Sequence, residues 1–239
     1  MENVKEKGFD IAYGKYCDHT VLRAYTKSEK VVEFCEEAKK YEAASVCVNP
    51  IHVALVAKCL QGTGIKTAVV VGFPLGANKP SVKAFETREA ILDGADEIDM
   101  VINIGALREG NYELVLEDIR GVVAAAGDAK VKVIIETCYL NDEEKAKACE
   151  LSMEAGADFV KTSTGMGTGG ATVDDIKLMK ACVGDKMEVK ASGGVDNREV
   201  AYAMIKAGAT RLGCSRLPQI VSDDTELDSA SKRNQPPKY

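Results

Sequence analysis

The phrases DGADEIDM at residues 93–100, EAGADFVK at 154–161 and KAGATRLG at 206–213 share one layout. In each phrase a glycine ends a helical pattern, and a strand-like run begins shortly after it. Glycine stops a helix by adopting a backbone conformation that other residues avoid, and a short loop then returns the chain to a sheet. The three phrases therefore predict a βα unit that recurs along the chain.

Runs of apolar, β-branched residues alternate with helical patterns throughout the sequence. The expected strands are Lys15–Asp18, Ala44–Val48, Lys66–Phe73, Glu97–Ile104, Val131–Thr137, Asp158–Ser163, Met187–Ala191 and Arg211–Cys214. Eight such units favour an α/β fold, a single closed (β/α)8 barrel, over the competing open doubly wound sheet. We expect the barrel, with a short helical lead-in, over residues 1–221 and a polar tail over residues 222–239. Ser28, Ser81, Asn141 and Asn197 are the expected caps of four helices.

The composition is that of a soluble globular protein, with 46% hydrophobic and 28% charged residues among 239. The net charge of -6 is spread along the chain without a basic patch, which disfavours nucleic acid as a partner. No run approaches the ~18 apolar residues of a membrane span, and the start of the chain lacks the apolar core of a signal peptide. The eight cysteines form no CxxC pair and are expected to be reduced thiols in a cytoplasmic protein. Only two histidines are present, so we expect no zinc site.

Alternation of side chains along three expected strands places ionisable groups inside the barrel. In the runs EIDMVIN, DFVKTST and MEVKASGG, the inward set includes Asp99, Lys161 and Lys190 respectively. Each is expected near the C-terminal end of its strand, where residues of such barrels carry catalysis. The alternative is an internal ion-pair network that only fills a polar core.

Two inward lysines near one aspartate suit the chemistry of a nucleophilic amine. A protonated lysine cannot attack a carbonyl, but burial or a second cation lowers its pKa. Lys190, expected on the next strand but one from Lys161, would supply that charge. Asp99 would then move protons, directly or through one water.

Glycine-rich turns follow the last three expected strands. Gly165 lies after the sixth strand, Gly193 and Gly194 follow the seventh, and Gly213 and Ser215 lie at the end of the eighth. Loops after the seventh and eighth strands of such barrels commonly bind phosphate through backbone N–H groups. We therefore expect an anion site there.

Six segments strongly resemble the deoxyribose-phosphate aldolase family: DFVKTSTGMGTGGAT, EVKASGGV, ADEIDMVINIG, VCVNP, VGFPLG and KVIIET. The likeness runs from about Cys17 to Ser215. The resemblance implies a class I aldolase that reversibly joins acetaldehyde to glyceraldehyde 3-phosphate through a lysine Schiff base. It implies neither a metal nor another cofactor, because the imine itself withdraws electrons.

The resemblance also implies roles for individual residues. It assigns the Schiff-base lysine to Lys161, the second lysine to Lys190 and the proton-relay aspartate to Asp99. Asp18, at the end of the first expected strand, would join the same polar network. The phosphate contacts would fall on Gly165, Gly193, Gly194, Gly213 and Ser215.

The sequence departs from the family pattern near the expected site. Met166 stands where an aromatic residue is more common, and Cys214 stands where threonine is. Arg216 follows Ser215 and would either contact phosphate or face solvent. Tyr239 ends a divergent tail, so a disordered end is favoured over the catalytic terminal tyrosine of some members.

Two other functions remain open at this stage. A phosphosugar isomerase or synthase barrel would keep the phosphate loops without imine chemistry. A binding-only barrel would sense a phosphorylated metabolite. A homo-oligomer is compatible with each, while His19, His52 and Cys47 are expected to be structural or surface residues.

Overall fold

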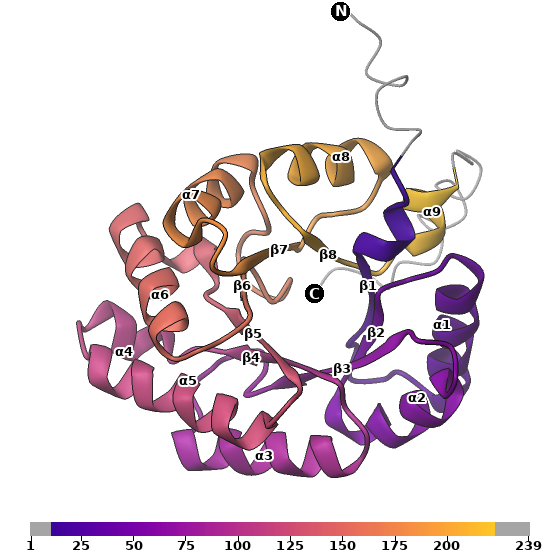
Figure 1. Cartoon of the computed structure of the whole chain (residues 1–239), viewed down its shortest axis with the longest axis horizontal. Coiled ribbons are helices and arrows are strands. Elements are labelled where there is room, and N and C mark those ends of the chain that lie inside the picture. Colours follow the sequence, from indigo (N-terminus) through magenta and orange to yellow (C-terminus); the bar gives the residue numbers. More distant parts are fainter. Residues whose placement is uncertain (1–10, 223–239) are drawn as a thin grey trace, which may run out of the picture.

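Eight parallel strands close into a barrel within residues 11–222, the part of the chain that the computed structural model describes (Figure 1). Strands β1 to β8 are Cys17–Val21, Ser45–Val48, Lys66–Val71, Glu97–Val101, Lys130–Ile134, Phe159–Lys161, Glu188–Ser192 and Arg211–Cys214. They pair in chain order, and β8 closes the barrel by pairing with β1. The predicted (β/α)8 barrel is confirmed. The expected lead-in and tail lie largely outside the described residues, so the domain limits stay a prediction.

Helices surround the strands in a ring (Figure 1). Helices α1 to α9 are Ser28–Lys40, Val53–Leu60, Pro80–Leu92, Ile104–Arg108, Tyr112–Ala126, Asp142–Glu154, Val173–Val183, Arg198–Ala207 and Leu217–Val221. The short 3-10 helices η2, η3 and η4 are Tyr13–Tyr16, Pro50–His52 and Thr137–Tyr139. None of the helices in residues 11–222 combines the length and the apolar character needed to cross a membrane.

The main core lies between the strands and the helix ring. Outward-facing strand residues such as Ile98, Val160 and Val189 are fully buried there. Burying one such side chain stabilises the fold by about 1.5–3 kcal/mol. Inside the barrel lie a small apolar cluster of Cys47, Ala68 and Val70, the buried Phe159 ring and a group of buried charged side chains. The predicted alternation of faces is therefore confirmed for these strands.

The first strand lies further along the chain than expected. Residues Tyr13–Tyr16 form the 3-10 helix η2, with the Tyr13 ring buried, and β1 begins only at Cys17. The prediction of a strand at Lys15–Asp18 was wrong in its bounds. Asp18 is consequently the second residue of β1 and does not end it.

Two of the four expected helix caps are confirmed. The Asn141 side chain accepts from the backbone N–H of Glu144 in a reciprocal capping box, and Asn197 caps α8. The predictions of Ser28 and Ser81 as caps were wrong, because α1 begins one residue and α3 two residues earlier than a cap at these positions requires. Their capping positions are Lys27 and Lys79, which make no side-chain capping bond.

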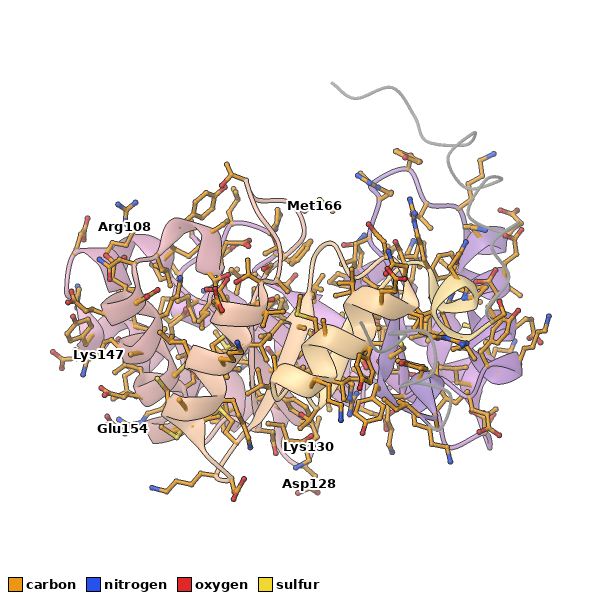
Figure 2. All side chains as sticks on the ribbon, turned by 90° about the horizontal axis from the view of Figure 1, so that it is seen from above. Arg108, Asp128, Lys130, Lys147, Glu154 and Met166 are labelled. Carbon is orange, nitrogen blue, oxygen red and sulfur yellow. The ribbon has the colours of Figure 1, made fainter. Side chains whose placement is uncertain are left out.

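Figure 2 views the barrel from its side, with Met166 and Lys130 on opposite faces. Met166 lies in the turn after the C-terminal end of β6, whereas Lys130 is the first residue of β5. The Met166 face therefore collects the C-terminal ends of the strands, and the candidate site opens there.

Candidate active site

A network of four basic and three acidic side chains fills the described barrel interior. Its members are Asp18, Glu97, Asp99, Lys132, Lys161, Lys190 and Arg211. All except Arg211 are buried. Buried charges persist only when they are paired, and each member contacts at least one opposite charge.

The three predicted catalytic residues meet at one oxygen. The Nζ atoms of Lys161 and Lys190 each lie 2.7 Å from Oδ2 of Asp99. Lys161 and Lys190 are register partners on the adjacent strands β6 and β7, so the expectation of an intervening strand was wrong. Only Lys161 ends its strand. Asp99 and Lys190 stand in the middle of β4 and β7.

Lys132 of β5 was missed by the sequence analysis, although it belongs to the same network. Its Nζ lies 2.5 Å from Glu97 Oε2, 2.9 Å from Asp99 Oδ1 and 3.0 Å from Asp18 Oδ2. The signal was present, because Lys132 alternates with Val131 and Val133 as the two predicted lysines alternate with their neighbours. Asp18 is fully buried beneath the cavity described below, where it also contacts Lys190 and Arg211.

The lysines share the three carboxylates unequally. Lys132 contacts three of them and Lys190 contacts two, whereas Lys161 contacts Asp99 alone. Burial lowers the pKa of Lys161, and the Lys190 charge lowers it further against the opposing effect of Asp99. Burial acts on Lys190 in the same direction, but Asp18 and Asp99 outweigh it and raise the pKa of Lys190. Lys161 is therefore the lysine of this pair that gives up its proton more readily.

The carboxylates of the network stay ionised. Burial favours their protonated form, but Lys132, Lys161 and Lys190 together hold the pKa of Asp99 below its usual range. Asp18 behaves in the same way, since burial is outweighed by Lys132, Lys190 and Arg211. Asp99 thus serves as a fixed hydrogen-bond acceptor for both lysines.

A cavity of about 750 Å³ opens above the network at the C-terminal ends of the strands. Lys161 reaches it, with 3% of its surface exposed. The predicted binding residues Gly165, Gly193, Gly194, Gly213 and Ser215 all line it, together with Met166. The structure therefore brings every predicted site residue to one place, either in the cavity wall or directly beneath it.

Two glycines of this cavity are required by their surroundings. Gly193 has φ +82°, and an added Cβ would lie 3.0 Å from the Cα of Gly170. The turn after β7 thereby packs directly on the turn after β6. An added Cβ at Gly213 would lie 2.8 Å from Ser192 Cβ and 3.2 Å from Lys190 Cε, so the absence of a side chain there makes room for Lys190.

Glu136 anchors the turn after β6 and was not predicted. Its carboxylate accepts a 2.5 Å hydrogen bond from Thr164 Oγ1 and a 3.2 Å bond from the Thr164 N–H. Glu136 is buried and has φ +54°, a conformation that is rare outside glycine and asparagine. A residue held in such a conformation is commonly part of a functional turn, but no sequence pattern marks it in advance.

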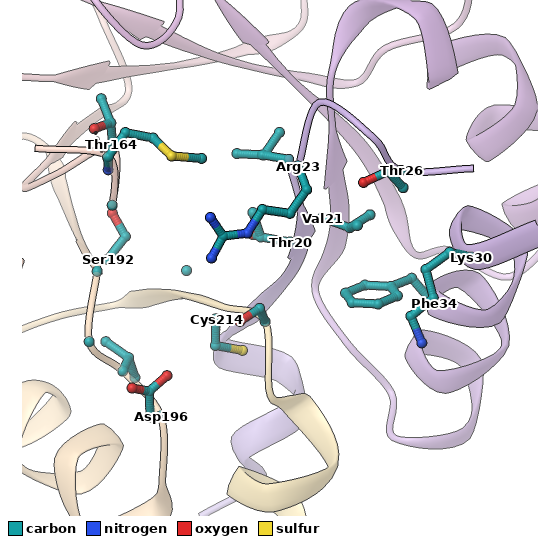
Figure 3. A pocket seen from close by; sticks show the side chains of 18 of the residues that line it. Thr20, Val21, Arg23, Thr26, Lys30, Phe34, Thr164, Ser192, Asp196 and Cys214 are labelled. Atoms are coloured by element: carbon teal, nitrogen blue, oxygen red, sulfur yellow. Dashed lines mark hydrogen bonds between the residues drawn. The ribbon is translucent and has the colours of Figure 1, made fainter. Parts of the chain in front are cut away.

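Besides Lys161, three basic residues line the cavity: Arg23, Lys27 and Lys30. Lys30 pairs with Glu33 at 2.6 Å. Arg216 follows the lining residue Ser215, and its Nε lies 3.7 Å from Asp196 Oδ1. Arg23 has no acidic partner among residues 11–222. Figure 3 shows its guanidinium extending into the pocket toward Ser192.

No group of three or more histidine, cysteine or carboxylate side chains within the described ranges is arranged to hold a metal ion. Tyr239, whose role the sequence leaves open, lies outside those ranges. The described cavity wall offers amines, a guanidinium group, carboxylates, hydroxyl groups, a thiol and backbone N–H donors.

Comparison with known proteins gives one consistent result. The model of the DeoC/LacD family of aldolases matches residues 14–219. A protein of Streptococcus suis named deoxyribose-phosphate aldolase is 63% identical over 84% of this chain and 91% of its own length. One of the same name from Clostridium tetani is 58% identical over 87% of this chain and 97% of its own.

Solved structures agree with the sequence relatives. The tetrameric deoxyribose phosphate aldolase of Aeropyrum pernix superposes with a TM-score of 0.85 at 28% identity, covering 94% of this chain and 97% of its own. An orotidine 5'-phosphate decarboxylase of Pyrococcus horikoshii reaches a TM-score of 0.59 at 16% identity, a likeness that shows the fold alone.

Proposed function

The chain belongs to the DeoC/LacD family of aldolases, and from this premise we propose that it is a deoxyribose-phosphate aldolase. It cleaves 2-deoxyribose 5-phosphate reversibly to glyceraldehyde 3-phosphate and acetaldehyde. An isomerase or synthase barrel and a binding-only sensor are not favoured, because the named relatives are aldolases over most of the chain.

The observation that carries the mechanism is the unequal sharing of carboxylates in the barrel. With four basic and three acidic side chains, the network is balanced in charge when one lysine is neutral. Lys161 has a single carboxylate partner and a lowered pKa, and it reaches the cavity. It is the lysine best placed to present a free amine to a substrate.

In this mechanism Lys161 Nζ attacks the C1 aldehyde of the open-chain sugar and expels water to form an imine. The protonated imine withdraws electrons, so the bond between C2 and C3 can break without a Lewis acid. Asp99 accepts hydrogen bonds from both lysines through one oxygen and so holds both Nζ atoms in place. The proton that Lys161 releases passes to water in the cavity, directly or by way of Asp99. Lys190 remains the cation that keeps the pKa of Lys161 low.

We place the substrate's phosphate at the opposite wall of the cavity. The turns that carry Gly193, Gly194 and Ser215 would offer backbone N–H donors to it. A phosphate dianion in an acidic protein also needs a nearby cation. Arg23 suits this role because it points into the cavity without an acidic partner in the described chain (Figure 3). Arg216, paired with Asp196, suits it less.

Trapping with borohydride tests the proposal. Acetaldehyde and sodium borohydride added together should reduce the imine to a stable ethyl group on Lys161, located by mass spectrometry of a tryptic digest. Borohydride without acetaldehyde is the control. An adduct on Lys190 would reverse the two lysine roles, whereas turnover without any adduct would overturn imine chemistry.

Assembly and compartment complete the proposal. The Aeropyrum pernix relative is described as tetrameric. Helix α3 leaves Val82, Phe85 and Leu92 between 46% and 80% exposed, which supports self-association of this chain as well. Light scattering of the wild type and of Phe85→Glu tests it, since a monomeric wild type would refute it. All eight cysteines are free, as expected in the reducing cytoplasm.

A further inference from the structure

A second cluster of chemically active side chains lies behind the cavity wall, between β8, β1 and α1. His19 of β1 and Cys214 of β8 are register partners on the helix-facing side of the barrel. Helix α1 contributes Glu37 and Phe34 from the other side. This cluster is separated from the lysine network, because Asp18 and Lys190 point to the opposite face of the same strands.

The imidazole of His19 is held in one orientation. Its ring stacks on Phe34 at a centroid distance of 4.0 Å and an interplanar angle of 12°, and its Nε2 lies 2.6 Å from Glu37 Oε2. The side chain is fully buried, and Nδ1 has no hydrogen-bond partner within residues 11–222. Burial opposes a charge on this ring, but interactions with Cys214 and Glu37 raise the pKa of His19.

The pKa of the neighbouring Cys214 thiol is shifted in the opposite direction. A hydrogen bond with Cys17 and the contact with His19 outweigh burial and the charge of Asp18, and they lower the pKa of Cys214 to about 6. Burial raises the pKa of Cys47 to about 11 and that of Cys35 to about 12. A thiolate, and not a thiol, is the nucleophilic form of cysteine.

Cys214 also has a path to solvent. It is 3% exposed and lines the substrate cavity between Gly213 and Ser215 (Figure 3). A small reagent that enters the cavity therefore meets this residue in the cavity wall, while Cys17 and His19 behind it are fully buried.

We propose that Cys214, His19 and Glu37 form a thiol modification site that opens into the substrate cavity and reacts with peroxides. The Cys214 thiolate attacks one oxygen of hydrogen peroxide and breaks the O–O bond. The sulfur is oxidised to a sulfenic acid, and the leaving hydroxide takes a proton from the His19 imidazolium to become water. Glu37 holds the imidazole and stabilises its charged form.

The modification has a consequence that rests on the proposed function. The added oxygen would lie on the helix-facing side of β8, behind the backbone of Gly213 and Ser215 that is proposed to hold the phosphate. Oxidation should then weaken binding of the phosphorylated sugar, and reduction by dithiothreitol should restore it.

Chemical labelling tests the site without any measurement of aldolase activity. The full chain is treated with hydrogen peroxide and dimedone at pH 7, and the dimedone adducts are mapped by mass spectrometry over time. We expect Cys214 to be labelled first, ahead of Cys59, Cys138 and Cys182, which are more exposed. Earlier labelling of any of these three would overturn the proposal.

Matched variants distinguish assistance of Cys214 by His19 and Glu37, called the relay below, from simple access of the reagent to the thiol. Because a thiol of ordinary pKa is only a few per cent ionised at pH 7, His19→Asn should slow labelling of Cys214 by about tenfold or more. Glu37→Gln, at a half-buried position, should slow it by a smaller factor in the same direction. Cys182→Ser should leave the rate at Cys214 unchanged. Equal labelling rates in wild type, His19→Asn and Glu37→Gln would refute the relay.

Discussion

Lys161 and Lys83 are both buried lysines whose pKa burial lowers, yet they occupy very different places. Lys83 lies between α3 and α5, fully buried, with its Nζ 2.5 Å from Asp118 Oδ2 and 2.7 Å from the carbonyl oxygen of Val101. Lys161 has one carboxylate partner and reaches a cavity of about 750 Å³. A shifted pKa therefore does not identify a catalytic lysine by itself, and access to a substrate decides.

The largest expected effect belongs to Lys161. Lys161→Arg keeps a positive charge but removes the attacking amine, so aldolase activity should fall by roughly a thousandfold or more and borohydride trapping should disappear. The free energy of unfolding should change less than in Lys83→Met. Steady-state kinetics and urea unfolding measure the two quantities. Substantial trapping at position 161 of the variant is chemically impossible, so any residual adduct would reveal a second reactive lysine.

Lys83→Met should produce the reverse pattern. It leaves the carboxylate of Asp118 buried without its partner, which costs about 3–5 kcal/mol of stability, while kcat of the folded fraction stays near wild type. Burial already raises the pKa of Asp118. The stability that a carboxyl group with a raised pKa contributes to the folded protein is lost as the pH rises. The destabilisation should therefore be smaller at pH 5 than at pH 8 in urea unfolding.

A second substitution checks this assignment. Asp118→Asn in the Lys83→Met background removes the unpaired charge and should recover part of the lost stability. No recovery would mean that Lys83 acts through packing against its surroundings.

The sequence predicted the lysines of the barrel interior much better than Lys83, which is buried between α3 and α5. Lys161 and Lys190 stand on strands, where a period of two assigns each side chain to a face before the barrel is known. Lys132 follows the same rule and was overlooked, not hidden. Lys83 stands in a helix rich in charged residues. Its burial depends on how α3 packs against α5, and the local sequence pattern does not predict that packing.

The first strand shows a different limit. Apolar and polar residues are mixed on both sides of Cys17, so pattern alone did not place the start of the strand. Burial of the Tyr13 ring in η2 decides the register, and that depends on contacts with distant elements. Glu136 is a similar case, since its positive φ becomes necessary only once the turn after β6 is anchored to it.

Lys190→Leu should have an intermediate effect and sharpen the account of why Lys161 is reactive. Removing the neighbouring cation raises the pKa of Lys161, since Lys190 lowers it and Asp99, freed of one partner, raises it. The neutral amine then forms only at higher pH, so the rising limb of adduct formation against pH should move upward. A shift of one unit corresponds to about 1.4 kcal/mol of interaction. An unchanged limb would mean that burial alone sets this pKa.

The smallest expected effect concerns Arg23, a cation that is neither buried nor paired with a carboxylate in residues 11–222. If it supplies charge to the phosphate, Arg23→Ala should raise KM for 2-deoxyribose 5-phosphate by about tenfold, the size of a hydrogen bond to a charged group. KM for unphosphorylated deoxyribose should not change, and kcat should stay within about twofold because the imine forms elsewhere. Arg23→Lys should recover part of the loss, and added salt should reduce the difference from wild type. Lys27→Ala, a second exposed lining cation, is the matched control and should leave both KM values near wild type. Equal losses for both sugars would mean that Arg23 maintains the conformation of the loop after β1 and does not bind the phosphate. Phosphate binding would then depend on the backbone donors of the two glycine turns.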